Sequence, residues 1–196
     1  MTNKIESVCV YCGASNTVED TYKNAIRTLG HSLAKAEKTL VYGGGSVGTM
    51  GIVSRAAMEA GGHVIGIIPE HIIEREGQDD ELTELHVVDS MHTRKMLMVE
   101  KSDAFIAMPG GMGTLDETFE ILTWKYLGLH NKPVVLANIN GYWDHLLKLL
   151  DSMIESGYTP KRHLDLFHLA TTPEEIMHYI ENYDLKIDEN TKIDKM

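Results

Sequence analysis

Short apolar runs rich in β-branched residues recur along the chain, and the gaps between them are long enough for a helix. Runs of this kind are typical of strands that are buried on both faces of a sheet. The pattern therefore predicts about seven strands. They span Ser7–Cys12, Thr39–Tyr42, His63–Ile68, Leu85–Val88, Ala104–Met108, Pro133–Ala137 and, more weakly, Leu166–Ala170.

The gaps carry apolar residues at helical spacing, and several helices are expected to begin at a capping residue such as Thr49 or Thr172. This alternation of strand and helix predicts an α/β fold, a Rossmann-like doubly wound parallel sheet with helices on both faces. Ligands of such sheets bind outside the carboxyl ends of the strands, so the loops that follow strands should hold the chemistry. The predicted helices span about Asp20–Lys35, Met50–Ala60, Met91–Lys101, Thr114–Leu127, Tyr142–Ser156 and Pro173–Tyr183.

Two segments break this rhythm. The chain between Pro69 and Ser90 is polar and acidic, which fits either a lid over a site or a solvated surface excursion. The excursion is the better explanation for most of its carboxylates. Residues 184–196 are charged and lack periodicity, so we expect a flexible tail there and a single domain over residues 1–183.

The composition is that of an ordinary globular protein, with 196 residues, 43% hydrophobic and 24% charged. No apolar run approaches the ~20 residues that cross a bilayer, and no signal peptide is evident, so we expect a cytoplasmic protein that does not bind membranes. The formal net charge of −11 argues against binding to nucleic acid. It leaves an anionic small molecule open, because a phosphate responds to local amides and nearby basic residues.

The two cysteines, Cys9 and Cys12, form one C-x-x-C pair inside a predicted strand. A structural zinc ion needs four ligands, and positions three apart on a strand point to opposite faces. Core packing is therefore the favoured role for both. The ten histidines show no metal-ligand spacing, so we expect neither a metal nor a cofactor.

A first glycine-rich junction, Gly43 to Gly51, follows a predicted strand and leads into a helix. Glycines such as Gly44 and Gly45 let a ligand approach the backbone, and the amides of the next helical turn offer an anion site. A dinucleotide site would need an acidic residue at the end of the next strand, but that strand ends in apolar residues, which disfavours NAD. Tight-turn packing without any ligand contact is the alternative for this loop.

A second junction runs from Pro109, which ends a strand, through three glycines to Thr114, which is placed to cap a helix. The Gly-Lys-Ser/Thr ending of a Walker loop is missing, so ATP hydrolysis is disfavoured. Asp116 and Glu117 fall in the expected first turn of the helix. There they could offset the helix dipole or serve catalysis, and the pattern leaves both open.

Arg94 and Lys95 are adjacent basic residues near the start of a predicted helix, where they oppose the helix dipole. A bound anion would explain their position. A solvated basic pair is the alternative.

Together these segments resemble the LOG family of cytokinin riboside 5′-monophosphate phosphoribohydrolases, long described as lysine decarboxylases. The resemblance covers roughly Val8 to Thr171, and its long motifs are highly specific for that family. The matching motifs are Gly43 to Gly51, Gly62 to Gly66, Met91-His92-x-Arg94-Lys95, Ser102 to Ala107, the Pro-Gly-Gly-x-Gly-Thr-x-x-Glu signature from Pro109 to Glu117, and Thr123-Trp124.

The resemblance implies hydrolysis of an N6-substituted adenosine monophosphate, or of AMP itself, to the free base and ribose 5-phosphate. It also implies a homodimer with sites near the interface, and it makes Arg94 and Glu117 catalytic. Met112 and Asp116 stand where the plant pattern often has an aromatic residue and a glutamate, which leaves the base preference open. The implied substrate contacts are Glu76, Lys95, Gly111, Met112, Gly113, Thr114, Leu115, Asp116 and Thr123.

Two other functions compete with hydrolysis. Relatives of this fold sense nucleotides or carry the molybdenum cofactor, and they bind without cutting. Glu117 discriminates, because a pure binder has no need of a carboxylate beside C1′. A pyridoxal-phosphate decarboxylase would need a Schiff-base lysine in a much larger cofactor framework, which the sequence lacks.

Overall fold

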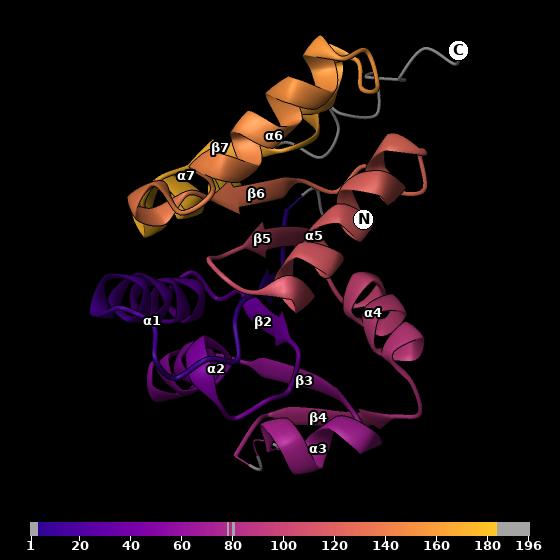
Figure 1. Ribbon diagram of the computed structural model, residues 1–196. Coiled ribbons are helices and arrows are strands. Elements are labelled where there is room, and N and C mark those ends of the chain that lie inside the picture. The colour runs from indigo at the N-terminus through magenta and orange to yellow at the C-terminus, as the bar shows by residue number, and fades with distance from the viewer. Residues whose placement is uncertain (1–3, 78, 80, 184–196) are drawn as a thin grey trace.

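Seven parallel strands form one sheet through the middle of the molecule (Figure 1). The computed structural model describes residues 4–77, 79 and 81–183, and the expected tail lies outside them. The sheet confirms the predicted fold class and all seven predicted strands. These are β1 (Ser7–Tyr11), β2 (Thr39–Tyr42), β3 (Val64–Pro69), β4 (Glu84–Val88), β5 (Ala104–Ala107), β6 (Val134–Ala137) and β7 (His168–Ala170).

Helices cover both faces of the sheet (Figure 1). They are α1 (Asp20–Lys35), α2 (Gly48–Glu59), α3 (Glu70–Glu76), α4 (Met91–Glu100), α5 (Met112–Tyr126), α6 (Asp144–Glu155) and α7 (Pro173–Asn182), with short 3₁₀ turns η1 (Ile139–Gly141) and η2 (Lys161–Leu166). Buried residues of α1, α2 and α7 pack in one apolar cluster. Those of α4 and α5 pack in a second cluster on the other face, and α6 adjoins α5 through a third. None of the helices in the described ranges is both long and apolar enough to cross a membrane.

The strand order β4-β3-β2-β1-β5-β6-β7 fixes where a ligand can bind. The chain builds the sheet outward from β1 to β4 and then returns to the free edge of β1 with β5, so that Tyr11 pairs with Ala107. The connection after β1 leads to α1 on one face, whereas the connection after β5 leads to α5 on the other. Such a reversal opens a crevice between the carboxyl ends of the two strands.

Cys9 and Cys12 lie in the core on opposite faces of the sheet, as predicted. Cys9 packs beneath α4 and α5, and Cys12 packs in the cluster that faces α1 and α2. Both are free and buried. In the described part of the chain, no three His, Cys, Asp or Glu side chains gather as a metal ion would require.

The acidic segment differs from the prediction because it contains the helix α3. Pro69 precedes this short helix without any capping hydrogen bond, so nothing in the sequence signals its start. Asp79 is also only half-exposed, and it is hydrogen-bonded within the protein. Its carboxylate accepts a hydrogen bond of 2.8 Å from the Ser54 hydroxyl, and its N–H donates to the Gly44 carbonyl at 3.3 Å. These contacts hold the segment against the first glycine loop.

The predicted helix starts were partly wrong. Thr172 caps α7 by accepting from the N–H of Glu175, as expected. Thr49 and Thr114, however, lie inside α2 and α5, because these helices begin earlier, at Gly48 and Met112. The preceding turns provide no side-chain cap in either case. The glycine loops are therefore shorter, and the helices longer, than the sequence suggested.

Candidate active site

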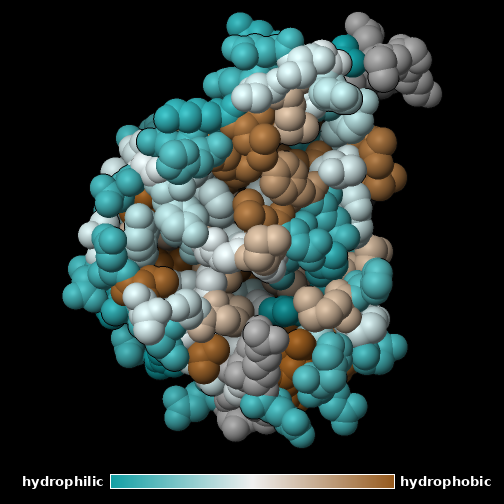
Figure 2. Space-filling model, in the orientation of Figure 1, coloured by the Kyte–Doolittle hydropathy of each residue, from teal (hydrophilic) through white to brown (hydrophobic). Residues whose placement is uncertain are grey.

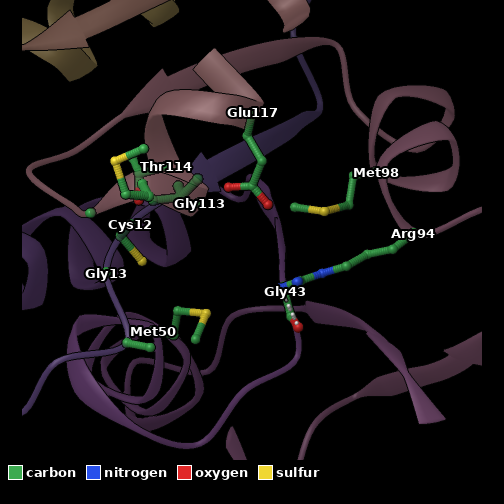
Figure 3. Close-up of a pocket in the computed structure, with 13 residues that line it drawn as sticks. Cys12, Gly13, Gly43, Met50, Arg94, Met98, Gly113, Thr114 and Glu117 are labelled. Carbon is green, nitrogen blue, oxygen red and sulfur yellow. Dashed lines mark hydrogen bonds between the residues drawn. The ribbon is translucent and has the colours of Figure 1, made fainter. Parts of the chain in front are cut away.

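A cleft of about 240 Å³ opens where β1, β2 and β5 end (Figure 3). Its position is the crevice that the strand order predicts. The residues that follow these strands form one side, and α4 and α5 supply side chains to the other. The lining consists of Val10, Cys12, Gly13, Ala14, Gly43, Met50, Arg94, Met98, Gly111, Met112, Gly113, Thr114 and Glu117.

The N-terminus of α5 opens into this cleft. Among the described residues, none accepts a hydrogen bond from the backbone N–H groups of Gly111, Met112, Gly113 or Thr114. By contrast, Ser90 caps α4 and Thr172 caps α7 through their side chains. Unpaired amides at the start of a 15-residue helix, together with the helix dipole, make a binding site for an anion such as a phosphate.

Neither the packing nor the backbone conformation of the protein requires glycine at positions 111 and 113. A Cβ atom added to either would meet nothing within 4 Å, and neither residue has a positive φ. Gly110 differs, because its Cβ would overlap the side chain of Thr114. Glycine usually costs helix stability relative to alanine, and the open space above Gly111 and Gly113 would let a ligand approach the backbone there.

The start of α2, after the first glycine loop, differs from the start of α5. The amides at the start of α2 are already used: Gly48 N–H donates to Asn16 Oδ1 at 2.8 Å, and Thr49 and Met50 donate to the Gly13 carbonyl at 3.0 and 3.3 Å. These hydrogen bonds occupy the donors of Gly48, Thr49 and Met50, which fits the alternative of tight-turn packing at this helix start.

Gly44 and Gly45 are buried and do not line the cleft. Gly44 has φ +74° and packs against Ile67 and Ile68, which explains why it is a glycine. The neighbouring Gly43 is the residue of this loop that reaches the cleft.

Arg94 is buried at 6% exposure and anchored to two strands. Its Nε donates to the carbonyl of Ile67 at 3.1 Å, and its Nη2 donates to that of Gly43 at 2.9 Å. Its Nη1 lies 3.8 Å from the sulfur of Met91. A guanidinium carries five N–H donors, so these contacts leave donors for a ligand in the cleft that Arg94 lines. Figure 3 shows the side chain reaching from α4 to Gly43.

Glu117 is half-buried on the second turn of α5, and its side chain points into the cleft (Figure 3). The helix dipole acts mainly within the first turn, so an earlier alternative, that Glu117 only offsets the dipole, loses its basis. Burial and, to a lesser extent, the Glu117 charge raise the pKa of the Cys12 thiol to about 12, against a hydrogen bond to Thr49. The thiol in the cleft is therefore neutral, and the charged groups that line it are Arg94 and Glu117.

Neither Lys95 nor Asp116 is among the residues that line the cleft. The Nζ of Lys95 contacts carboxylates of α5 instead, at 3.2 Å from Asp116 and 2.9 Å from Glu120. Arg94 and Lys95 thus point to different surroundings, although they are neighbours in sequence.

Three further predicted residues lie elsewhere. Leu115 packs against the cluster of Ala107, Leu136 and Trp143. Thr123 is exposed and lines a second, apolar cavity of about 290 Å³ between α5, α6 and η2. Figure 2 shows apolar surface in this region between α5 and α6. Glu76 is the last residue of α3, and its side chain is outside the described part of the chain.

Sequence reasoning missed several residues of the cleft. Gly13 had a usable signal, because it directly follows the first predicted strand. Met50 and Met98 had none, since they reach the cleft from helices whose rotation depends on tertiary packing. Cys12 was assigned to the core, and it both packs there and lines the cleft.

The fold and the site define a parallel α/β protein with a cleft at the carboxyl ends of β1 and β5, into which the start of α5 opens. A family model described as "Possible lysine decarboxylase" matches residues 50–180. The chain belongs to this family, the LOG family. It is 42% identical to the cytokinin riboside 5′-monophosphate phosphoribohydrolase LOG3 of Arabidopsis thaliana, over 92% of this chain and 84% of that protein. For LOG7 of the same plant the identity is 40%, over 96% and 87%.

Among solved structures, the molybdenum cofactor binding protein of Rippkaea orientalis is similar in fold. Its TM-score is 0.68 at 25% identity, with 91% of this chain and 97% of that chain covered. This likeness concerns the architecture of the sheet and its helices.

Proposed function

We propose that this protein hydrolyses the N-glycosidic bond of N6-substituted adenosine 5′-monophosphates, and of AMP, to the free base and ribose 5-phosphate. The proposal transfers the activity in the names of the Arabidopsis relatives to this chain. The observation that carries it is that the Glu117 carboxylate and the unpaired amides of α5 face one cleft.

In this proposal the 5′-phosphate binds to the amides of Gly111 to Thr114. The helix dipole and the donor geometry favour an anion at that place. Because the phosphate does not take part in the reaction, its binding energy serves to hold C1′ of the ribose against the carboxylate. A nucleoside without the phosphate should therefore be a poor substrate.

Glu117 acts at C1′. As the bond between C1′ and the base nitrogen breaks, its electron pair leaves with the base and the sugar becomes cation-like. A carboxylate beside C1′ stabilises that charge and takes a proton from the water that attacks C1′. The departing base nitrogen takes up one proton, which balances the proton that Glu117 takes from water and later releases, and ribose 5-phosphate is the other product.

Arg94 supplies a fixed positive charge. A guanidinium is a poor general acid, so we assign Arg94 to binding the substrate or orienting the Glu117 carboxylate, and not to proton donation. The hydrogen bonds to the carbonyls of Gly43 and Ile67 support this role, because they hold the charge in one place before a ligand arrives.

We also propose a homodimer, as the family resemblance implies. Helix α6 is amphipathic, yet none of its residues is buried within the monomer, and Leu149 on this helix and Leu127 after α5 are more than half exposed. A second copy covering the apolar surface between α5 and α6 would explain these features. Light scattering on the purified protein should give twice the mass of the chain; a monomer at all concentrations would contradict this part of the proposal.

The proposed activity is tested by incubating the purified protein with AMP, isopentenyl-AMP and adenosine and separating the products by chromatography. Free base should appear from one or both monophosphates and far more slowly from adenosine. Binding of the monophosphates without release of base would favour the alternative, a nucleotide-binding or molybdenum-cofactor-binding protein. The ratio of rates for the two monophosphates would settle the base preference.

A further inference from the structure

We propose that Lys95 is a positioning residue that ties α4 to α5 and so holds Glu117 at its working place opposite Arg94. The inference rests on the proposed function for the role of Glu117. The link between the two helices does not depend on that function, because it rests on the distances from Lys95 to Asp116 and Glu120.

The ammonium group of Lys95 bridges two carboxylates on successive turns of α5. Its Nζ lies 3.2 Å from Asp116 Oδ2 and 2.9 Å from Glu120 Oε1. Residues four apart on a helix are neighbours on one face. A cation between them therefore contacts two successive turns of that face. Such a contact opposes both rotation of α5 about its axis and sliding along it.

The bridge is partly shielded from water. The Lys95 side chain is only 14% exposed and that of Glu120 is 25% exposed, whereas Asp116 is 59% exposed. Burial lowers the pKa of Lys95, but the hydrogen bonds and charges of Glu120 and Asp116 outweigh it, and the pKa is raised. Ion pairs at fully exposed sites contribute little, so the Glu120 contact should carry most of the tie.

Glu117 lies between the two bridged positions in the sequence of α5. Any rotation of α5 that separates Asp116 and Glu120 from Lys95 therefore also moves the Glu117 carboxylate. Arg94, the residue before Lys95, is fixed by the carbonyls of Gly43 and Ile67. The anchored Arg94 and the bridging Lys95 together set the position of Glu117 relative to the positive charge in the cleft.

A direct contact between Lys95 and the substrate would be a different mechanism, and the two make opposite predictions. A lysine that binds the phosphate acts independently of Asp116 and Glu120, so its removal should mainly raise KM. A lysine that positions α5 loses its role once both carboxylates are gone. Its removal should then mainly lower kcat, because displacement of a reacting group by about 1 Å can cost on the order of a hundredfold.

The experiment is a double-mutant cycle with Lys95→Met as one change and Asp116→Asn with Glu120→Gln as the other. Steady-state kinetics on the monophosphate and the urea midpoint of unfolding are measured for each variant. Lys95→Arg, which keeps the charge, should recover part of the activity. Lys23→Met is the matched control, because Lys23 forms an ion pair with Asp20 on α1 and is not among the residues that line the cleft.

We expect each change alone to lower kcat by about 10- to 100-fold with a smaller change in KM, and the combination to be no worse than either one. The midpoints should follow the same non-additive pattern, and the control should match the wild type. Independent effects on both kcat and the midpoint, or a loss confined to KM, would overturn the proposal. If the wild type releases no base, the proposed function fails, and the midpoints alone still decide whether the tie exists.

Discussion

Nη2 of Arg94 lies 2.9 Å from the carbonyl oxygen of Gly43, and a methyl group on Gly43 would overlap that same nitrogen. Gly43 does not have a positive φ, so the backbone itself would accept an alanine. The requirement for glycine at this position comes from the guanidinium. Two residues 51 positions apart in the chain thus determine where the positive charge of the cleft lies.

The first prediction follows from this contact. Gly43→Ala should displace the guanidinium and reduce kcat/KM for the monophosphate by about a hundredfold, while the protein stays folded. Steady-state kinetics and circular dichroism check the two parts. Arg94→Lys should have a similar effect, and the double variant should be no worse than the more damaging single one. A fully active Gly43→Ala protein would show that the anchored position of Arg94 is unimportant.

Of the elements in the described residues, the sheet and every α-helix except α3 could be predicted, because their signals are local. Apolar runs with gaps of helical length identify strands and helices wherever both faces of a sheet are covered, as they are here. The helix α3 had no such signal, since it is short and begins directly after Pro69 without a cap. The start of α5 was placed too late for a related reason. Thr114 has the chemistry of a cap but lies within the helix.

The site was harder to predict because it depends on packing between distant segments. The motif around Glu117 and Arg94 pointed to the cleft that the structure contains. The bridge from Lys95 to Glu120 depends on how α4 lies beside α5, which no periodicity reveals. The hydrogen bonds of the amides at the start of α2 could not be predicted either, because their acceptors, Gly13 and Asn16, lie in the connection after β1.

The second prediction concerns Gly113, which lines the cleft at the start of α5 and has open space where a side chain would be. Gly113→Ala should leave the fold intact or stabilise it by up to about 1 kcal/mol, because alanine is the better helix former. The same methyl group should intrude on the phosphate and weaken AMP binding by about tenfold, or 1.4 kcal/mol. Thermal unfolding and isothermal titration with AMP measure the two effects. Unchanged affinity would contradict the placement of the phosphate.

The third prediction concerns the neutral state of His130. Its Nδ1 accepts from the N–H of Lys132 at 3.1 Å, and its Nε2 lies 2.9 Å from the Ile121 carbonyl, which assigns the proton to Nε2. Burial, with smaller contributions from nearby Lys125 and Lys132, lowers the pKa of His130 despite the bond to Ile121. Protonation of Nδ1 would remove the acceptor that Lys132 uses.

Because the unfolded chain protonates His130 near its ordinary pKa of about 6.5 and the folded protein does so only at lower pH, this residue disfavours the native state in acid. Stability should be unaffected by His130 above that value and should fall as the pH drops from it through the folded pKa. Urea midpoints between pH 7.5 and pH 5 measure the slope. His130→Gln should flatten it, whereas the same change at the exposed His71 should not. An equal slope in both variants would count against the assignment.

The most direct test of the proposed function is the release of free base by Glu117→Gln, compared with the wild type on the same monophosphate. Glutamine keeps the shape of the side chain but cannot stabilise a cation at C1′ or accept a proton from water. We predict that base release falls by at least about a hundredfold while the affinity for AMP is retained. Glu155→Gln, at the exposed end of α6, should match the wild type. Undiminished base release by Glu117→Gln would contradict the assignment of this carboxylate to the broken bond.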